Sequence, residues 1–327
     1  MHMRLKEVPH VILFQGGLDS SEYLLIPLCR LVLYLCQNNN DMNNYNTLHN
    51  NIYLKMSCGF FDSYIHYINM SLDYLEKKNA HERDAHITFD EGPHIYTIDG
   101  DSGFTSVTTW NHSHFSGFDA DAIISGMMRS ARWPQSKYFG MSVDEIKAGW
   151  DKNRDEAAAA GTKMHYDIEC YYNDMDVSND SVEYGYFKKY LESYGHLKPY
   201  RTEWMIYHEE LRMAGSIDMI YECDDGSGDL LIYDWKRCKE IKKIDGFGKC
   251  GNKECIEHLP DTNYWHYCLQ LNTYKAILEQ KYGKKVRELY LVCLHPDNKN
   301  GSYQRIKVVD LQEEVGELFQ LRKRKLV

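Results

Sequence analysis

The pattern of apolar and polar residues predicts strands and then helices in the middle of the chain. Residues 86–110 alternate with a period of two between the turn sequences EGP and DGDSG, which predicts two or three short strands. Residues 117–173 carry helix-forming sequence, and Ser142 followed by Glu145 predicts an N-cap with a capping box. A further helix is expected over 181–194.

The remaining C-terminal part alternates strand-like runs with helices. Apolar runs at 201–210, 212–223 and 229–238 predict three strands, and a polar, basic segment follows at 237–259. A helix over 263–282 should end at Gly283, before strands at 285–296 and 303–311 and a final helix. This order predicts an α/β fold with a central mixed β-sheet flanked by helices.

The first 85 residues have a different character. Two helix-like stretches, about 20–36 and 60–78, surround an asparagine-rich segment at 38–46. We therefore interpret 1–85 as a mainly helical N-terminal accessory region and 86–327 as the principal domain. The longest apolar run, 23–36, is shorter than the roughly 20 residues that span a bilayer, so a core helix is expected and no membrane contact.

Composition limits the kinds of partner and the compartment. The net charge of −10 gives no global positive field that would attract nucleic acid. A local basic patch could still do so, since seven Lys or Arg residues fall between 236 and 253. The ten cysteines are scattered, mostly within apolar segments, and no signal peptide is recognisable. An intracellular protein with reduced thiols is therefore expected.

Two apolar strands carry acidic residues that have no evident structural use. The sequence DDGSGD predicts a tight turn, and a hairpin centred on Gly226 places Asp218 opposite Asp234. Lys236 lies two residues further along and projects to the same face. Facing carboxylates repel each other unless a cation lies between them, so this arrangement predicts a divalent metal site beside an ammonium group.

Two helices contribute further candidates. His165 and Glu169 are four residues apart and therefore share a helix face, where they could add metal ligands. Gln270 and Tyr274 have the same spacing and could hydrogen-bond phosphate groups or support Lys236.

These motifs together resemble the PD-(D/E)xK nuclease superfamily, over roughly residues 105–310. The strings are Gly161-Thr162-x-x-His165-x-x-x-Glu169, Gly215-x-x-Asp218, Asp234-Trp235-Lys236 and Gln270-x-x-x-Tyr274. The order and spacing are most similar to the RecB-type branch, which includes the mitochondrial genome maintenance exonuclease, and SVTTW at 106–110 resembles a motif preceding the core. The composition, rich in asparagine and tyrosine, resembles that of related proteins from large DNA viruses.

The resemblance implies a restriction-endonuclease-like core and a role for each motif residue. It implies Mg²⁺ or Mn²⁺ as cofactor, with metal ligands and catalytic groups as follows: His165, Asp218 and Asp234 as ligands, Glu169 as a supporting or second-metal acid, Lys236 as the catalytic lysine, and Gln270 and Tyr274 as an auxiliary motif. Glu203 lies where many members carry a glutamate, and its role stays open.

The resemblance also implies an activity. The expected function is a metal-dependent deoxyribonuclease, an exonuclease acting on single-stranded or free-ended DNA. A catalytically silent binding or assembly module and an RNA-cutting nuclease are the alternatives. The helical stretch 117–160 is a candidate wall of a strand channel, because stacking aromatic rings and cations suit single strands; its residues of interest are Arg129, Arg132, Trp133 and Trp150.

Two other readings remain open from the sequence. VILFQGGLDSSEYLL at 11–25 resembles the phosphate-binding loop of ATP pyrophosphatases, although Gln15 replaces the first serine and the repeated strand–helix units are lacking. A zinc site is the second alternative, although the spacing of its cysteines differs from the common pattern; its residues would be Cys250, Cys255, His258, His266 and Cys268.

Overall fold

The computed structural model describes residues 72–326. They belong to a compact unit that runs from Ile68 to Val327. The expected helix at 20–36 and the pyrophosphatase-like loop at 11–25 lie outside the described residues. Between residues 72 and 326, the helices are all too short or too polar to cross a membrane.

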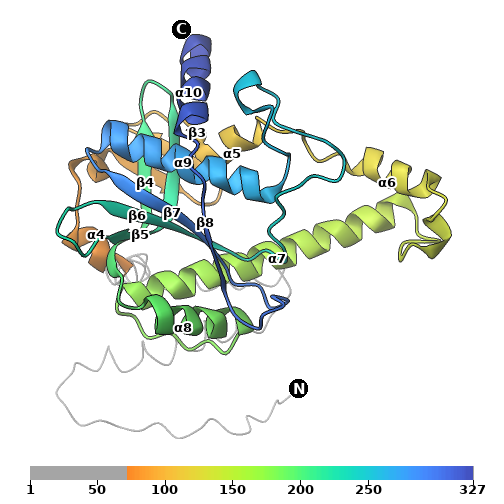
Figure 1. Cartoon of the computed structure of the whole chain (residues 1–327), viewed down its shortest axis with the longest axis horizontal. Coiled ribbons are helices and arrows are strands. Elements are labelled where there is room, and N and C mark those ends of the chain that lie inside the picture. Colours follow the sequence, from red (N-terminus) through yellow and green to blue (C-terminus); the bar gives the residue numbers. More distant parts are fainter. Residues whose placement is uncertain (1–71, 327) are drawn as a thin grey trace, which may run out of the picture. The chain divides into compact units, whose positions relative to one another are not determined.

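A six-stranded mixed sheet forms the centre of the described unit (Figure 1). Strand β5 pairs antiparallel with β4 along one edge, and its other edge pairs with β3 at one end and with β6 at the other. Strand β6 continues in parallel to β7, which pairs antiparallel with β8. The bounds are β3 Thr105–Ser106, β4 Lys198–His208, β5 Met213–Glu222, β6 Leu230–Lys236, β7 Val286–Cys293 and β8 Gln304–Lys307.

Helices cover both faces of this sheet. One apolar core joins the sheet to α5, α9 and α10, and a second core joins it to α7 and α8. Neighbouring residues of β5 alternate between the two, since Ile220 packs in the first core and Tyr221 in the second. The helices are α5 Val107–His112, α6 Ala120–Arg129, η2 Trp133–Gln135, α7 Val143–Tyr172, α8 Val182–Tyr194, η3 Glu254–Ile256, α9 Asn263–Lys281 and α10 Gln312–Leu326. The predicted α/β fold with a central mixed sheet flanked by helices is confirmed.

The segment before the main sheet packs on the outer strand β4. It contains α4 Tyr74–Lys78, η1 Glu82–His86 and a hairpin of β1 Ile87–Asp90 and β2 Ile95–Ile98. Asp84 accepts hydrogen bonds from Arg201 Nη1 at 2.7 Å and from Trp204 Nε1 at 2.8 Å. Residues 74–86 are therefore joined to the sheet by partly buried polar contacts.

The predicted local signals act where the sequence places them. The Ser142 hydroxyl accepts a hydrogen bond from the Glu145 amide, and the Glu145 carboxylate accepts one from the Ser142 amide, which completes the capping box at α7. Gly283 follows α9 with φ of 60°, the left-handed conformation that glycine adopts without strain. Gly226 and Gly228 have φ of 73° and 74° and form the β5–β6 turn.

Candidate active site

The candidate site lies where strands β5 and β6 separate. Their last ladder pair is Met219 with Tyr233, so Asp218 and Asp234 are the next positions in the same register, as the hairpin prediction requires. Instead of continuing the ladder, the Trp235 amide donates a hydrogen bond to Oδ2 of Asp218 at 2.9 Å. Because Asp218 and Asp234 occupy facing positions of an antiparallel pair, their side chains project to the same face of the sheet.

Lys236 and Asp234 form a buried ion pair. Lys236 Nζ lies 2.6 Å from Oδ2 of Asp234, whose side chain is 2% exposed. Burial lowers the pKa of Lys236, but the negative charges of Asp234 and Asp218 outweigh burial and raise it above its ordinary value. The ring of Tyr267, from α9, lies 4.9 Å from Nζ. The Lys236 ammonium group therefore stays protonated, and its contacts with Asp234 and Tyr267 fix its orientation.

His165 reaches this point from helix α7. Its Nδ1 lies 3.5 Å from Oδ2 of Asp218 and 3.7 Å from Oε1 of Glu203. Burial lowers the pKa of His165, but the two carboxylates raise it further, to about 9. The imidazole therefore carries a proton near neutral pH when no metal competes for it.

Glu203 is a site residue whose role the sequence left open. It lies on β4 between the ladder pairs Thr202–Met219 and Trp204–Ile217, at the position facing Asp218. Its φ of 42° is left-handed, which costs a non-glycine residue about 1–2 kcal/mol. Ser216 Oγ donates to its Oε2 at 2.8 Å. This backbone kink turns the carboxylate toward His165.

Two acidic groups of the site have raised pKa values when no metal ion is bound. Burial and the neighbouring Asp234 raise the pKa of Asp218 to about 7. Burial and the charge of Glu203 raise the pKa of Glu169 to about 8. Such shifts mark groups whose charges are crowded and incompletely compensated.

The donor set fits a divalent cation. The ligand atoms of His165, Glu203 and Asp218 lie within 4.8 Å of one another. Oδ1 of Asp234 is buried and has no hydrogen-bond partner among residues 72–326, an expensive arrangement that a cation would relieve. Asp234 and Glu169 lie outside the group of three, so the structure adds Glu203 beside the ligands expected from sequence.

Gln270 and Tyr274 lie on the α9 side of the same site. Gln270 Nε2 donates to the Tyr274 hydroxyl at 3.2 Å. A Cβ atom at Gly215 would lie 2.8 Å from Cε1 of Tyr274 and 3.3 Å from Cβ of Val107. The glycine of the motif Gly215-x-x-Asp218 is therefore required because Tyr274 packs directly against its backbone.

Replacing Gly215 by alanine is expected to destabilise the fold by about 1–3 kcal/mol, because the methyl group overpacks a buried contact with Tyr274. Urea denaturation followed by circular dichroism measures this loss. Gly185→Ala is the matched control, since nothing lies within 4 Å of its Cβ position in α8 and alanine favours a helix. Equal stability of the two variants would contradict the packing argument.

Tyr96 is a neighbour of the site that no sequence signal indicated. It lies on β2, is 5% exposed, and its pKa is raised to about 12 by burial and by the charges of Glu203 and Asp218. Only the docking of the β1–β2 hairpin brings this hydroxyl group near the acidic cluster.

The alternative zinc ligands do not converge. The groups of described residues that could hold a metal contain no cysteine. His258 Nε2 lies 3.3 Å from Glu314, and His266 Nε2 lies 2.8 Å from Asp261. Cys250 is exposed whereas Cys268 is buried in α9. The five residues named for this alternative therefore form no group of three possible metal ligands among the described residues.

Comparisons with known proteins give little further information. No model of a known protein family matches the chain, and no curated protein matches it. Among solved structures, the chain matches the crystal structure of a "Putative exonuclease" from Eubacterium rectale, with 13% sequence identity and a TM-score of 0.29. The match covers 68% of this chain and 80% of the other. At this level the likeness establishes neither family nor function.

Proposed function

We propose that the protein is a metal-dependent deoxyribonuclease that hydrolyses phosphodiester bonds of single-stranded or free-ended DNA. One observation carries the proposal: His165, Glu203 and Asp218 converge beside the buried pair of Asp234 and Lys236. Phosphoryl transfer uses carboxylates to hold metal ions next to a cationic side chain, and this cluster combines carboxylates, an imidazole and an ammonium group.

Each side chain has a distinct role in the proposed mechanism. Asp218, Asp234 and His165 would hold Mg²⁺ or Mn²⁺, with Glu203 or Glu169 as a further acid. When bound, the cation supplies Lewis-acid activation of water and of the phosphate group.

Lys236 orients the attacking water and stabilises the negative charge that develops on the phosphate oxygens. Tyr274 and Gln270 border the candidate site on the side of α9. Asp218 keeps its direction because the Trp235 amide fixes one of its oxygens. In the proposed mechanism the scissile phosphate binds where the β5–β6 ladder ends, between the acidic cluster and Lys236.

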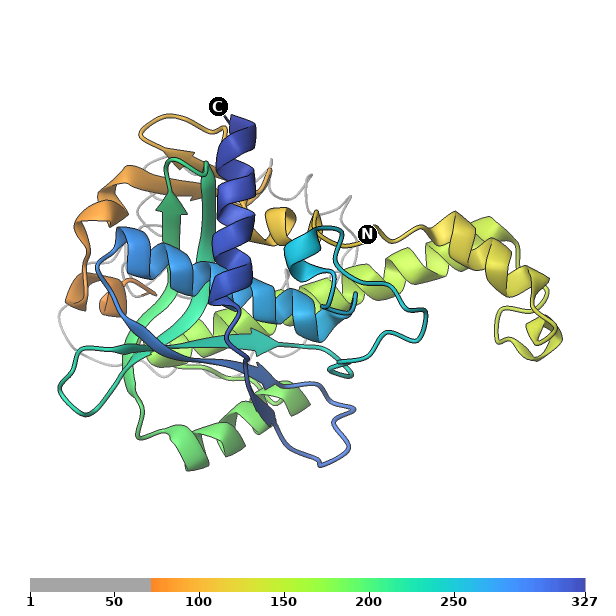
Figure 2. The same cartoon turned by 45° about the horizontal axis from the view of Figure 1, so that its top comes forward.

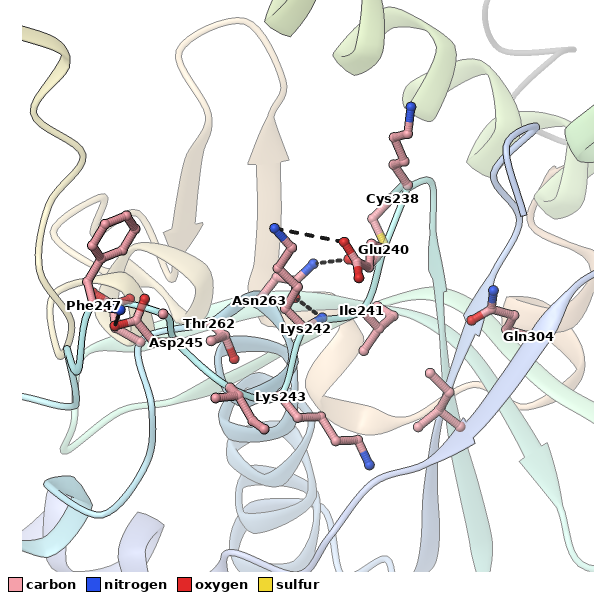
Figure 3. A pocket seen from close by; sticks show the side chains of 15 residues that line it. Cys238, Glu240, Ile241, Lys242, Lys243, Asp245, Phe247, Thr262, Asn263 and Gln304 are labelled. Carbon is pink, nitrogen blue, oxygen red and sulfur yellow. Dashed lines mark hydrogen bonds and ion pairs between the residues drawn. The ribbon is translucent and has the colours of Figure 1, made fainter. Parts of the chain in front are cut away.

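A large groove begins two residues beyond Lys236. It measures about 1080 Å³, and its lining comes from residues 238–247, from the start of α9 and from β8 (Figure 3). Lys243 has no carboxylate partner among residues 72–326, and Phe247 and Ile244 are 90% and 83% exposed. Cations beside exposed apolar side chains suit a single strand, whose phosphates and bases need both. We assign this groove to the DNA strand.

The double variant Lys243→Ala/Phe247→Ala is expected to weaken binding of a single-stranded oligonucleotide by about tenfold, because one cation and one stacking surface are lost. Fluorescence anisotropy at several salt concentrations measures the effect, and the salt dependence should become shallower. Lys188→Ala/Val182→Ala is the matched control. Lys188, like Lys243, lies over a tyrosine ring and has no carboxylate partner among residues 72–326, and Val182 is an exposed apolar side chain of the same helix. Equal affinity of both variants would remove the groove from the proposal.

Helix α6 and the first half of α7 form the other surface expected to contact a DNA strand. Figure 2 shows α6 and the N-terminal half of α7 extending past the sheet. Ile124 and Ile146 are fully buried between them, and Trp150 donates from Nε1 to the Tyr138 hydroxyl at 2.8 Å. Trp150 is therefore engaged in packing, which favours the groove at 238–247 as the principal strand surface.

Degradation assays test the proposed activity. The full chain is incubated with Mg²⁺ or Mn²⁺ and with end-labelled single-stranded, double-stranded or circular DNA, and with RNA of the same sequence. The proposal requires metal-dependent loss of the linear single-stranded DNA. Cleavage of RNA alone would favour the RNA-cutting alternative, and binding without cleavage in every condition would favour the silent module.

A further inference from the structure

Two cysteine side chains touch at the end of the strands that carry the candidate site. Sγ of Cys238 lies 3.5 Å from Sγ of Cys293. Cys293 is the last residue of β7 and pairs with Lys236 in the β6–β7 ladder. Cys238 is the second residue after Lys236 and lies in the lining of the groove at 238–247. Both are reduced in this structure.

The two thiols differ in access. Cys238 is half-buried and faces the groove, whereas Cys293 is 1% exposed. The Cys293 thiol donates a hydrogen bond to the carbonyl oxygen of Cys238 at 2.8 Å. The Cys238 sulfur can therefore react with a reagent from solvent, while the Cys293 sulfur is held next to it in the interior. This arrangement suits an attacking thiol and a resolving thiol.

The contact also favours a thiolate. The hydrogen bond with the Cys238 side chain lowers the pKa of the Cys293 thiol to about 7. The same contact and burial raise the pKa of the Cys238 thiol, so the thiolate forms on Cys293 and reaches Cys238 by transfer of a proton between the two sulfur atoms, which lie in contact. Thiolate is the form that attacks disulfides.

We propose that Cys238 and Cys293 form a thiol–disulfide exchange site for a low-molecular-weight disulfide such as glutathione disulfide. The Cys238 thiolate attacks one sulfur of glutathione disulfide, which forms a mixed disulfide and releases one glutathione thiolate. Cys293, after giving up its proton, attacks the Cys238 sulfur and releases the second glutathione. The protein loses two electrons and two protons, and glutathione disulfide gains both.

The position gives the exchange a structural consequence. A disulfide requires the sulfur atoms to approach from 3.5 Å to about 2.05 Å. The bond would tie the first residue of the groove lining to β7, beside Lys236. The groove at 238–247 would thereby be linked covalently to the sheet under oxidising conditions, whereas under reducing conditions only the non-covalent contact between Cys238 and Cys293 joins them.

Peptide mass spectrometry tests the exchange on the full chain. The protein is equilibrated with reduced and oxidised glutathione at several ratios, free thiols are alkylated, and the digest is analysed without reductant. A peptide pair linked through Cys238 and Cys293 should appear as the oxidised fraction rises and vanish with dithiothreitol. Absence of this pair at every ratio, with the protein folded by circular dichroism, overturns the proposal.

Single variants separate the two steps. Cys293→Ser should retain one glutathione on Cys238, because no resolving thiol remains, and Cys238→Ser should carry none on Cys293, because that thiol is buried. Cys255→Ser is the matched control and should form the linked pair as the wild type does. Loss of the pair in that control, or glutathione on Cys293, overturns the assignment. The readout needs no nuclease activity, so its failure and a failure of DNA hydrolysis are distinguishable.

Discussion

Replacing Lys236 by methionine is expected to reduce DNA hydrolysis by about a thousandfold, because its ammonium group is the cation proposed to stabilise the charge that develops on the phosphate. Lys236 Nζ is the group that faces both aspartates. Single-turnover degradation of end-labelled DNA with saturating Mg²⁺ measures the loss. Lys285→Met is the matched control, since that lysine is 75% exposed and pairs with Asp229 away from the site.

The same substitution should also affect stability. It leaves Asp234 buried without its ion-pair partner, and removal of one member of a buried pair costs about 3–5 kcal/mol. The double variant Asp234→Asn/Lys236→Met should recover most of that stability in urea denaturation without recovering hydrolysis. Activity in the double variant would show that the lysine acts only through the fold, and the proposed mechanism would then be wrong.

Mg²⁺ is expected to raise the unfolding temperature, and to do so more strongly as the pH rises. The metal-free protein holds protons on Asp218, Glu169 and His165, with pKa values of about 7, 8 and 9. A metal needs the deprotonated forms. Each proton that binding displaces strengthens apparent affinity by about tenfold per pH unit below that group's pKa, so affinity should increase between about pH 6 and pH 9.

The stability of the metal-free protein should decrease as the pH rises. The raised pKa of His165 contributes stability that is complete below its ordinary value of about 6.5 and is lost as the pH rises through about 9. Thermal unfolding with chelator and with Mg²⁺, measured at each pH, gives both curves. The gap between them should widen toward alkaline pH.

Two variants identify the group responsible for the Mg²⁺ effect. Asp218→Asn should lose more than tenfold in Mg²⁺ affinity. Glu210→Gln should lose none, because Glu210 belongs to a second cluster with His208 and Glu209 that Lys281 and Arg83 already neutralise. If Mg²⁺ raised the unfolding temperature of Asp218→Asn as much as that of the wild type, the proposed site would be excluded. If Mg²⁺ no longer raised the unfolding temperature of Glu210→Gln, the metal would bind at the second cluster instead.

The sequence by itself determined the elements and the register of the central hairpin. Turn glycines, the Ser142 cap and the stop at Gly283 are short-range signals, and they act through backbone conformations that the structure confirms. The distance in residues from Gly226 sufficed to place Asp218 and Asp234 at facing positions, because alternation in a strand has a fixed period. Helical spacing placed His165 on the same face as Glu169, but not against a particular strand.

Only the tertiary structure decided which groups meet. Glu203 turns toward His165 because its backbone adopts a left-handed conformation between two regular ladder pairs, which no local pattern encodes. Glycine is required at position 215 only because Tyr274, far along the chain, packs against its backbone. The contact of Cys238 with Cys293 depends on the parallel pairing of β6 with β7. These contacts join residues distant in sequence, so packing of the sheet and its covering helices, and not local propensity, fixes them.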